Sequence, residues 1–187
     1  MTEHRPPPIA TASEPVEGLL IRHLREADLP ALEWEGQYTH FRNLYAEAYQ
    51  RMQVGKAVLW VVEVPQIGLI GQAFIQLKIN GRPRLADGWS RAYLHSFRVR
   101  PEYRGRGVGT RMMQVVEDDL QRRGFRNVLL NVTRDNQAAY DLYMRLNYQV
   151  VGEDEGKWSY VDQHGVVQHV HEPGWRLQKS LGVPSTQ

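Results

Sequence analysis

The hydrophobic positions of this 187-residue chain follow two different spacings. Short runs dense in β-branched and aromatic residues predict β-strands. The predicted strands cover residues 19–24, 57–64, 69–79, 91–99, 127–132, 148–151, 157–161, 165–170 and 174–181. Apolar residues that recur every three or four positions predict amphipathic helices. The first predicted helix starts at the signal formed by Asp28 and Pro30 and ends at Gly55, and the others cover residues 108–124 and 135–146.

The order of these elements predicts a single α/β domain with a mixed sheet. Residues 57–79 hold two strands joined by a short turn, which predicts an antiparallel hairpin in the N-terminal half. Strand, helix, strand and helix alternate over residues 91–146, and such a unit places its two strands in parallel at the centre of the sheet. Residues 157–170 predict an added C-terminal hairpin, which either walls a binding pocket or forms the contact of a homodimer.

Composition narrows the possible partners and chemistry. The 23 Lys and Arg nearly balance the 21 Asp and Glu, and a net charge of +2 predicts neither a nucleic-acid partner nor a membrane surface. Cysteine is absent, which excludes disulfides and catalysis by a thiol. Residues 1–17 hold four prolines and few large apolar groups, so we expect a mobile tail there and the folded domain over residues 18–182. Since the chain has no apolar run of about 20 residues and no signal-peptide pattern, the expected location is the cytoplasm.

A cluster of glycines and arginines follows the strand predicted at residues 91–99. The sequence "RGRGVG" (104–109) lies between that strand and the next predicted helix. A helix start offers free backbone amides and the positive end of the helix dipole, and glycine lets a ligand approach the backbone closely. The cluster therefore predicts an anion site, although the dinucleotide pattern GxGxxG and the GK[ST] ending of a P-loop are both absent. The alternative is a solvated basic turn.

Two motifs in this half of the chain resemble the GNAT N-acetyltransferase family. The first is Arg-x-x-Gly-x-Gly, which runs from Arg104 to Gly109. The second is Asn-x-x-Ala-x-x-x-Tyr, formed by Asn136, Ala139 and Tyr143. Ala139 and Tyr143 are four residues apart, so on a helix they share one face and can meet a single ligand.

The resemblance implies a GNAT acyltransferase fold with acetyl-coenzyme A as the cosubstrate and no metal. It implies that the glycine loop binds the pyrophosphate of coenzyme A, mainly through its backbone. The residues that it implies for coenzyme A binding are Phe97, Val99, Arg104, Gly105, Arg106, Gly107, Val108, Gly109, Thr110, Asn136, Ala139 and Tyr143. The chain departs from the family at the Gly-Phe pair that follows the second motif, where it has Asn147 and Tyr148.

The strand before the glycine cluster breaks the alternation of a regular strand. Leu94, Phe97 and Val99 are the expected inward residues, and the step from 94 to 97 is one residue too long. A β-bulge near His95 and Ser96 would absorb the extra residue. In the family such a bulge separates this strand from the next one, and the pantetheine arm pairs with the exposed backbone; the alternative is an ordinary strand.

The resemblance also implies the reaction, which is direct transfer of an acetyl group to an amine. Tyr143 corresponds to the family's general acid, which protonates the departing thiolate, and its alternative role is that of a core tyrosine. Glu33, Glu35 and His95 are weak candidates for the general base, and water is the alternative. His164, His169 and His171 lack a carboxylate at ligand spacing, so no metal site is predicted.

The acceptor is predicted only as a primary amine of a small molecule or peptide. The acidic residues 153–155 could attract a cationic acceptor or form a solvated loop. Two alternative functions stay open, a non-catalytic binder of acyl-coenzyme A and a transferase for a larger acyl group. A nucleic-acid module is the weakest alternative, because it requires the arginines of residues 98–111 on one open face.

Overall fold

Two β-sheets and three α-helices make up residues 14–182, the part of the chain that the computed structural model describes. The larger sheet consists, in spatial order, of β1 (Leu20–His23), β2 (Ala57–Val64), β3 (Gly68–Gln76), β4 (Arg91–Val99), β5 (Asn127–Thr133), β9 (Gly174–Ser180) and β6 (Gln149–Asp154). Strands β4 and β5 are parallel, and every other neighbouring pair in this sheet is antiparallel. The predicted mixed α/β sheet, with its antiparallel N-terminal half and parallel central pair, is confirmed.

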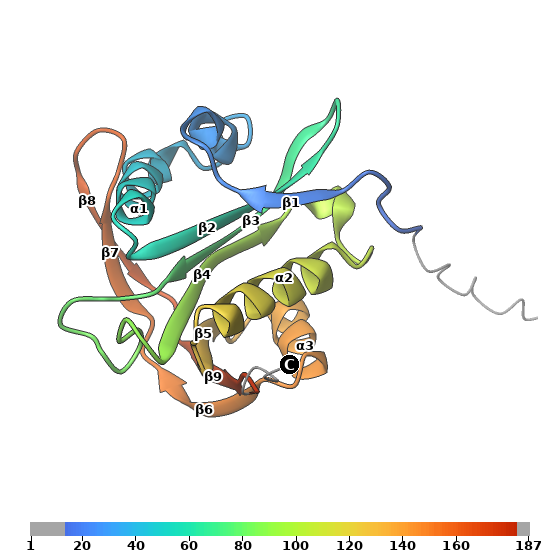
Figure 1. Cartoon of the computed structure of the whole chain (residues 1–187). Helices are drawn as coiled ribbons and strands as arrows, with labels where there is room; N and C mark the ends of the chain where they lie inside the picture. Colours follow the sequence, from blue (N-terminus) through green and yellow to red (C-terminus); the bar gives the residue numbers. More distant parts are fainter. Residues whose placement is uncertain (1–13, 183–187) are drawn as a thin grey trace, which may run out of the picture.

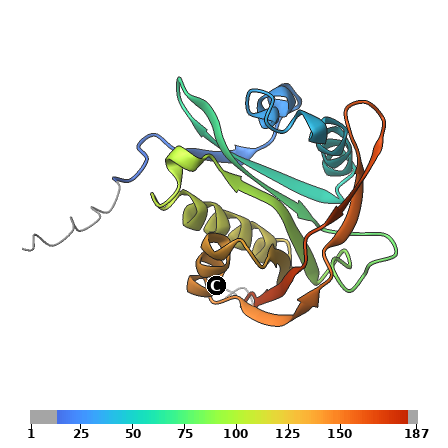
Figure 2. The same ribbon diagram turned by 180° about the vertical axis from the view of Figure 1, so that it is seen from behind.

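Helices cover both faces of the larger sheet. Helices α2 (Val108–Arg122) and α3 (Gln137–Arg145) lie on one face, and α1 (Arg42–Gln53) lies on the other with the short 3₁₀ helices η1 (Glu26–Glu33) and η2 (Thr39–Phe41) (Figures 1 and 2). A third 3₁₀ helix, η3 (Pro101–Tyr103), links β4 to α2. No helix within residues 14–182 is long and apolar enough to cross a membrane.

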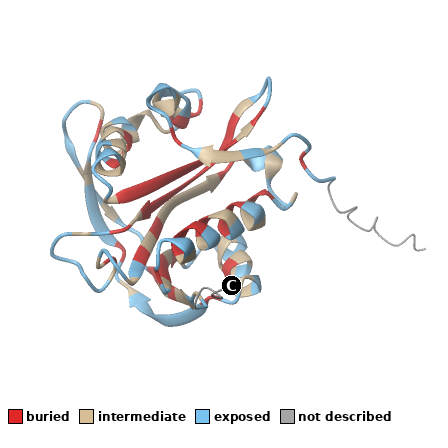
Figure 3. Ribbon diagram, in the orientation of Figure 1, coloured by how far each residue is buried: buried red, intermediate tan, exposed pale blue. Residues whose placement is uncertain are grey.

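The two faces of the sheet carry two separate hydrophobic clusters. The cluster beneath α2 includes Val108, Met112, Val116 and Leu120, which repeat every four residues and are all at most 1% exposed. Burial of each such side chain contributes about 1.5–3 kcal/mol, so this face fixes α2 against β4 and β5. The second cluster lies beneath α1, on the opposite face of the sheet, and includes Tyr45 of that helix. Figure 3 shows the buried residues gathered in the central strands and along α2.

The expected long helix that starts at Asp28 is wrong. Asp28 lies in the 3₁₀ helix η1, where it pairs with Arg22 and accepts a hydrogen bond at 2.7 Å from the backbone of Arg25, the N-cap residue of that short helix. That turn ends where Trp34 and Glu35 adopt left-handed backbone with φ of 44° and 55°. Since a right-handed helix cannot continue through such residues, α1 begins only at Arg42.

The predicted N-terminal tail falls largely outside the described residues, because residues 1–13 are not among them. Val16, which the prediction assigned to the tail, is 7% exposed and belongs to the cluster beneath α2. Glu14 accepts a hydrogen bond at its carbonyl oxygen from Arg106 Nε at 2.8 Å. The packed domain therefore begins before residue 18.

The predicted C-terminal hairpin is confirmed as a separate sheet of β7 (Lys157–Val161) and β8 (Val167–His171). Its turn is held by the Asp162 carboxylate, which accepts hydrogen bonds from the amides of His164 and Val166. Tyr160 on β7 packs against Phe41 with ring centroids 4.8 Å apart. The hairpin thus extends the α1 side of the molecule (Figure 1).

Candidate active site

Strand β4 contains the predicted bulge. Its register with β3 pairs Arg98 with Gln72 and His95 with Phe74, so Ala73 alone faces two residues of β4. Ser96 has a left-handed backbone with φ of 50°, which is how the extra residue is accommodated. The bulge was therefore correctly predicted from the irregular apolar spacing.

The parallel pairing of β4 with β5 ends at this bulge. The last paired residues are Leu94 and Leu130, whereas β5 goes on pairing with β9 as far as Thr133. Beyond Leu94 the two strands separate, and the β4 backbone of residues 95–99 has no β5 partner. An extended ligand could bind there through hydrogen bonds to the free strand edge.

The glycine cluster forms the entrance to α2. Gly105 and Gly107 have φ of 70° and 78°, a conformation that glycine adopts without strain. Gly107 caps α2, and the first hydrogen bond inside the helix runs from the Arg111 amide to the Gly107 carbonyl. The amides of Val108, Gly109 and Thr110 precede that first bond, so they are available to an anion at the positive end of the helix dipole.

The two arginine side chains of the cluster point to the protein backbone. Arg104 Nε donates to the Val99 carbonyl at 2.9 Å, and Arg106 Nε donates to the Glu14 carbonyl at 2.8 Å. These contacts hold the loop against the end of β4 and against the N-terminal segment. Any anion at this position would accordingly be bound chiefly by amides, as the resemblance implies.

Tyr143, Phe97 and Gly109 come together where β4, α2 and α3 meet. The rings of Phe97 and Tyr143 have centroids 6.1 Å apart, and Tyr143 is 4% exposed. A Cβ atom on Gly109 would lie 3.2 Å from Leu142 Cδ2 and 3.5 Å from Phe97 Cζ, so glycine permits this close approach of α2 to α3. Burial raises the pKa of the Tyr143 phenol well above its usual value, which keeps the group protonated at neutral pH.

The second motif begins at the start of α3. The Asn136 side chain accepts a hydrogen bond from the Ala139 amide at 3.2 Å and so caps the helix. Ala139 packs against the cluster beneath α2. Asn147, which replaces the family's glycine after the helix, has the left-handed φ of 64° that glycine usually supplies. Asparagine tolerates this conformation, so the departure from the motif leaves the local geometry intact.

Glu33 and Glu35 are both engaged by arginines. Arg42 hydrogen-bonds to Glu33 and lowers the pKa of that carboxyl group, and Thr39 adds a further hydrogen bond. Arg100 pairs with Glu35 at 2.8 Å and likewise lowers the pKa of its carboxyl group. Carboxylates held in this way are weaker proton acceptors than free ones.

His95 lies at the bulge, on the face of the sheet turned to α1. Arg51 Nε donates to Gln76 Oε1 at 2.7 Å, which leaves the Gln76 NH₂ group to donate to His95 Nε2 at 3.2 Å. The His95 proton is then on Nδ1, 3.1 Å from Ser96 Oγ. Burial, together with the charges of Arg51 and Arg98, lowers the pKa of His95 to about 4. The imidazole is neutral at neutral pH, but its basic nitrogen already accepts a hydrogen bond.

The lowered pKa of His95 predicts a pH-dependent stability. In the unfolded chain the pKa is near 6.5 and in the folded chain about 4, so the unfolded state binds more protons between these values. The free energy of unfolding should be highest above pH 6.5 and should fall as the pH decreases from 6.5 to 4. Urea unfolding across this range should give a shallower slope for His95→Gln. The exposed variant His169→Gln is the control, and equal slopes for all three proteins would contradict the prediction.

Residues that the sequence analysis did not single out adjoin the bulge on the α1 side. Arg98 Nη1 donates to the Tyr45 hydroxyl at 2.6 Å. Gln72, which pairs with Arg98 in the sheet register, is fully buried. The sequence could have indicated the side on which both residues lie. Neighbouring residues of a strand point to opposite faces, so Arg98 after Phe97 and Gln72 after Gly71 must face away from the cluster beneath α2. Within residues 14–182, no group of three His, Cys, Asp or Glu side chains could hold a metal ion.

Chains of known structure with this fold include acetyltransferases. Arabidopsis thaliana NAA60, solved in complex with acetyl-CoA, matches with a TM-score of 0.64 and 20% identity over 87% of this chain and 99% of that chain. Residues 69–148 match the acetyltransferase (GNAT) family. The family match covers the bulged strand, the glycine cluster and the second motif, and the likeness to NAA60 extends over the fold.

Two curated relatives align with the central part of the chain. N-alpha-acetyltransferase 30 of Schizosaccharomyces pombe is 34% identical over 58 residues, which are 31% of this chain and 39% of that protein. Thialysine N-epsilon-acetyltransferase of Bos taurus is 38% identical over 64 residues, which are 34% of this chain and 38% of that protein. The aligned segment thus spans less than two fifths of either relative.

Proposed function

We propose that this protein is an N-acetyltransferase, which transfers the acetyl group of acetyl-coenzyme A to the primary amine of a small molecule or peptide. The observation that carries the proposal is the end of β4–β5 pairing at the bulge, next to the free amides of α2. This arrangement offers a strand edge for the pantetheine arm and a helix start for the pyrophosphate. The relatives named for acetylation of N-alpha and N-epsilon amines, and the NAA60 complex with acetyl-CoA, support the same reaction.

In this proposal the donor lies along β4 and reaches the start of α2. The backbone of Phe97 and Val99 pairs with the amides of the pantetheine arm, and the Val99 carbonyl also accepts from Arg104. The amides of residues 105–110 bind the pyrophosphate, with Arg104 and Arg106 positioning the loop. Asn136 and Ala139 form the first turn of α3. This helix places Tyr143 next to the thioester of the donor.

The reaction requires no covalent enzyme intermediate. The lone pair of a neutral amine attacks the thioester carbonyl carbon, a C–N bond forms, the C–S bond breaks, and sulfur leaves as a thiolate. A backbone amide at the bulge polarises the carbonyl oxygen. Tyr143 then gives its proton to the thiolate, and the phenolate that remains regains a proton from water. Because Glu33, Glu35 and His95 are all engaged by neighbours, we propose that water removes the proton lost by the amine.

Two measurements test the proposed function. Acetyl-coenzyme A at a concentration 100 times its Kd should stabilise the protein by about 2.7 kcal/mol, which appears as a higher Tm. Purified protein with acetyl-coenzyme A and a panel of amines should release free thiol, detected with a thiol reagent. Lack of both coenzyme A binding and thiol release would reject the proposal.

The two alternative functions give different results in the same assays. A non-catalytic binder would show the rise in Tm without thiol release for any amine. A transferase for a larger acyl group would gain more stability from succinyl- than from acetyl-coenzyme A. A cytoplasmic location and a homodimer remain part of the proposal, supported by the composition and the added hairpin.

A further inference from the structure

Arg98 is a partly buried cation without a carboxylate partner among residues 14–182. Its Nη1 atom donates to the Tyr45 hydroxyl, and its other nitrogens make no hydrogen bond with the described residues. It follows Phe97 in β4, so its side chain lies on the face opposite to the proposed pantetheine arm. The guanidinium is therefore on the α1 side, two residues beyond the bulge.

Aromatic rings hold this guanidinium in place. Arg98 Cζ lies 3.9 Å from the centroid of the Tyr38 ring and 5.0 Å from that of Phe41. These rings would otherwise be suited to an acceptor cation, but the protein's own cation occupies them. A fixed planar fork with free N–H groups is instead suited to a carboxylate.

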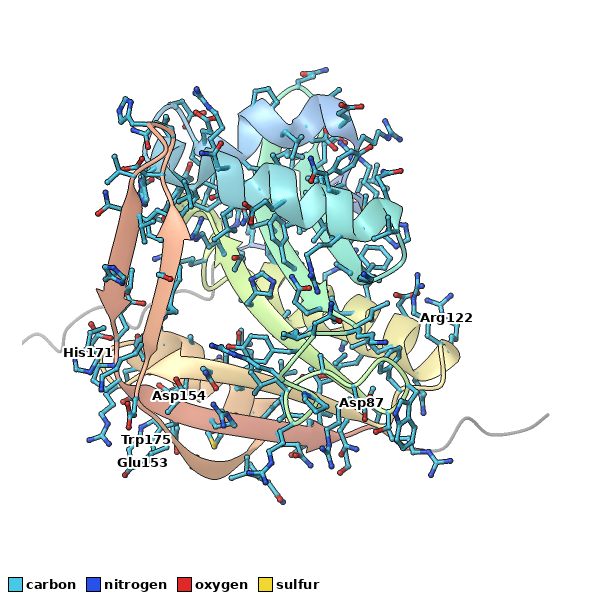
Figure 4. All side chains as sticks on the ribbon, turned by 90° about the vertical axis from the view of Figure 1, so that its left-hand side faces the viewer. Asp87, Arg122, Glu153, Asp154, His171 and Trp175 are labelled. Atoms are coloured by element: carbon cyan, nitrogen blue, oxygen red, sulfur yellow. The ribbon has the colours of Figure 1, made fainter. Side chains whose placement is uncertain are left out.

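Five acidic residues that could attract a cationic acceptor are each paired with an arginine or a lysine. Glu33 pairs with Arg42 and Glu35 with Arg100, and the acidic run at residues 153–155 is paired throughout. Asp154, labelled in Figure 4, pairs with the neighbouring Arg176 of β9. These five carboxylates are therefore already neutralised by the protein's own cations.

A second arginine on this side also lacks a carboxylate. Arg51 donates to Gln76 Oε1 and to the Lys78 carbonyl, both uncharged groups. Burial is the main cause of the lowered pKa of His95, and the charges of Arg51 and Arg98 lower it further. The α1 side of the bulge is therefore electrostatically positive. Figure 4 shows this face of the sheet between α1 and the β7–β8 hairpin.

Gln72 provides an independent sign of an unfilled polar site. Its side chain is fully buried on β3, and its oxygen and nitrogen make no hydrogen bond of ordinary length and angle with the described residues. It neighbours Arg98 in the sheet register and lies close to the Tyr45 hydroxyl. A buried amide without partners is costly, and such groups are often found at sites that bind a ligand.

We propose that Arg98 binds a carboxylate of the acceptor, so that the enzyme acetylates amines that carry a carboxylate near the amine nitrogen. This inference rests on the proposed N-acetyltransferase function. The carboxylate has two possible sources, a free amino acid or an acidic residue close to the N-terminus of a peptide. The proposed reaction takes place at the bulge, where Ser96 lies. Because a strand rises about 3.3 Å per residue, Arg98 is some 6–7 Å along β4 from Ser96, and the amine and carboxylate of a short amino acid can span this distance.

Matched pairs of acceptors test the proposal. Thiol release is compared for glycine and glycinamide, for β-alanine and its amide, and for 4-aminobutyrate and its amide. A peptide pair that begins Ser-Glu or Ser-Gln, amidated at its C-terminus, separates the peptide source from the free amino acid. We expect at least one acid to exceed its amide in kcat/KM by about 10- to 100-fold, the value of a charge-assisted contact. The diamine 1,4-diaminobutane should be a poor acceptor.

Variants at Arg98 connect the preference to this residue. Arg98→Gln should raise the KM of the preferred acid about 10- to 100-fold, with a much smaller change in kcat, and should abolish the preference over the amide. Arg98→Lys retains the charge without the paired N–H groups of the guanidinium, so it should recover part of the preference. If Arg98→Gln does not fold, Arg98→Lys tests the role of Arg98 in its place. Arg91→Gln is the matched control, because it removes an exposed arginine from the start of the same strand.

The outcomes separate this inference from the proposed function. Equal kcat/KM for acids and amides, or an acid preference that survives in Arg98→Gln, overturns the role of Arg98 and leaves the acetyltransferase intact. Acetylation of diamines in preference to all carboxylate-bearing amines also overturns the role of Arg98 and leaves the acetyltransferase function intact. No thiol release from any amine overturns both, and the Tm shift with acetyl-coenzyme A then shows whether donor binding is retained.

Discussion

Tyr143→Phe is expected to lower kcat about 100-fold and to leave the affinity for coenzyme A nearly unchanged. General acids contribute about 10²- to 10⁴-fold to a rate, and the variant removes only the hydroxyl that we propose as the proton donor. The Tyr143 hydroxyl makes no hydrogen bond with the described residues, and phenylalanine keeps the ring contacts with Phe97 and Tyr148. Steady-state thiol release and titration with coenzyme A measure the two quantities.

The matched control is Tyr140→Phe, which removes a hydroxyl from the same helix. It should retain full kcat. Full activity of Tyr143→Phe would assign protonation of the thiolate to water or another group. If the native protein binds coenzyme A without turnover and Tyr143→Phe changes nothing, the binder alternative is favoured.

Thr110→Glu should weaken coenzyme A binding and at the same time stabilise the free protein. Thr110 is the third residue of α2, and no acidic residue occupies the first turn of that helix. A carboxylate there interacts favourably with the helix dipole and should raise the free energy of unfolding by about 0.3–1 kcal/mol. The same charge repels a pyrophosphate at the helix start, for which we expect a loss of affinity of about 30- to 100-fold.

The opposite signs of these two effects make Thr110→Glu a specific test. Gln114→Glu adds the same charge one turn further along α2, at an exposed position, and should change the affinity little. Calorimetry with coenzyme A and thermal unfolding without it provide the measurements. Unchanged affinity in Thr110→Glu would place the pyrophosphate away from the start of α2.

Local spacing in the sequence predicted most of the elements. Strands β2, β4 and β7 have the predicted ends, because a run of β-branched and aromatic residues favours a strand locally. The bulge was predicted from the spacing within one strand, since an extra residue shifts every following side chain to the other face. The expected long helix from Asp28 failed, because the Asp28 carboxylate binds Arg22 and the Arg25 amide at the start of the short 3₁₀ helix η1, and α1 begins only at Arg42.

Contacts between distant residues could not be predicted in this way. The insertion of β9 between β5 and β6 depends on which strand edges remain unpaired after the rest of the sheet has formed. Glu33 and Glu35 were candidates for the base, and only the folded chain revealed their pairing with Arg42 and Arg100. A sequence identifies a titratable group, but its pKa depends on burial and on charges brought near it by folding.

The sequence alone indicated the segment that we propose for donor binding. The glycine cluster, the amphipathic helix after it and the bulged strand before it are consecutive, so their geometry follows from local backbone preferences. The tertiary structure decided the proposed acceptor side, where β3, β4 and α1 bring Gln72, Arg98 and Tyr45 together from separate segments. Whether an arginine is free to bind a carboxylate depends on which other residues reach it, and only the packing of the whole sheet fixes that.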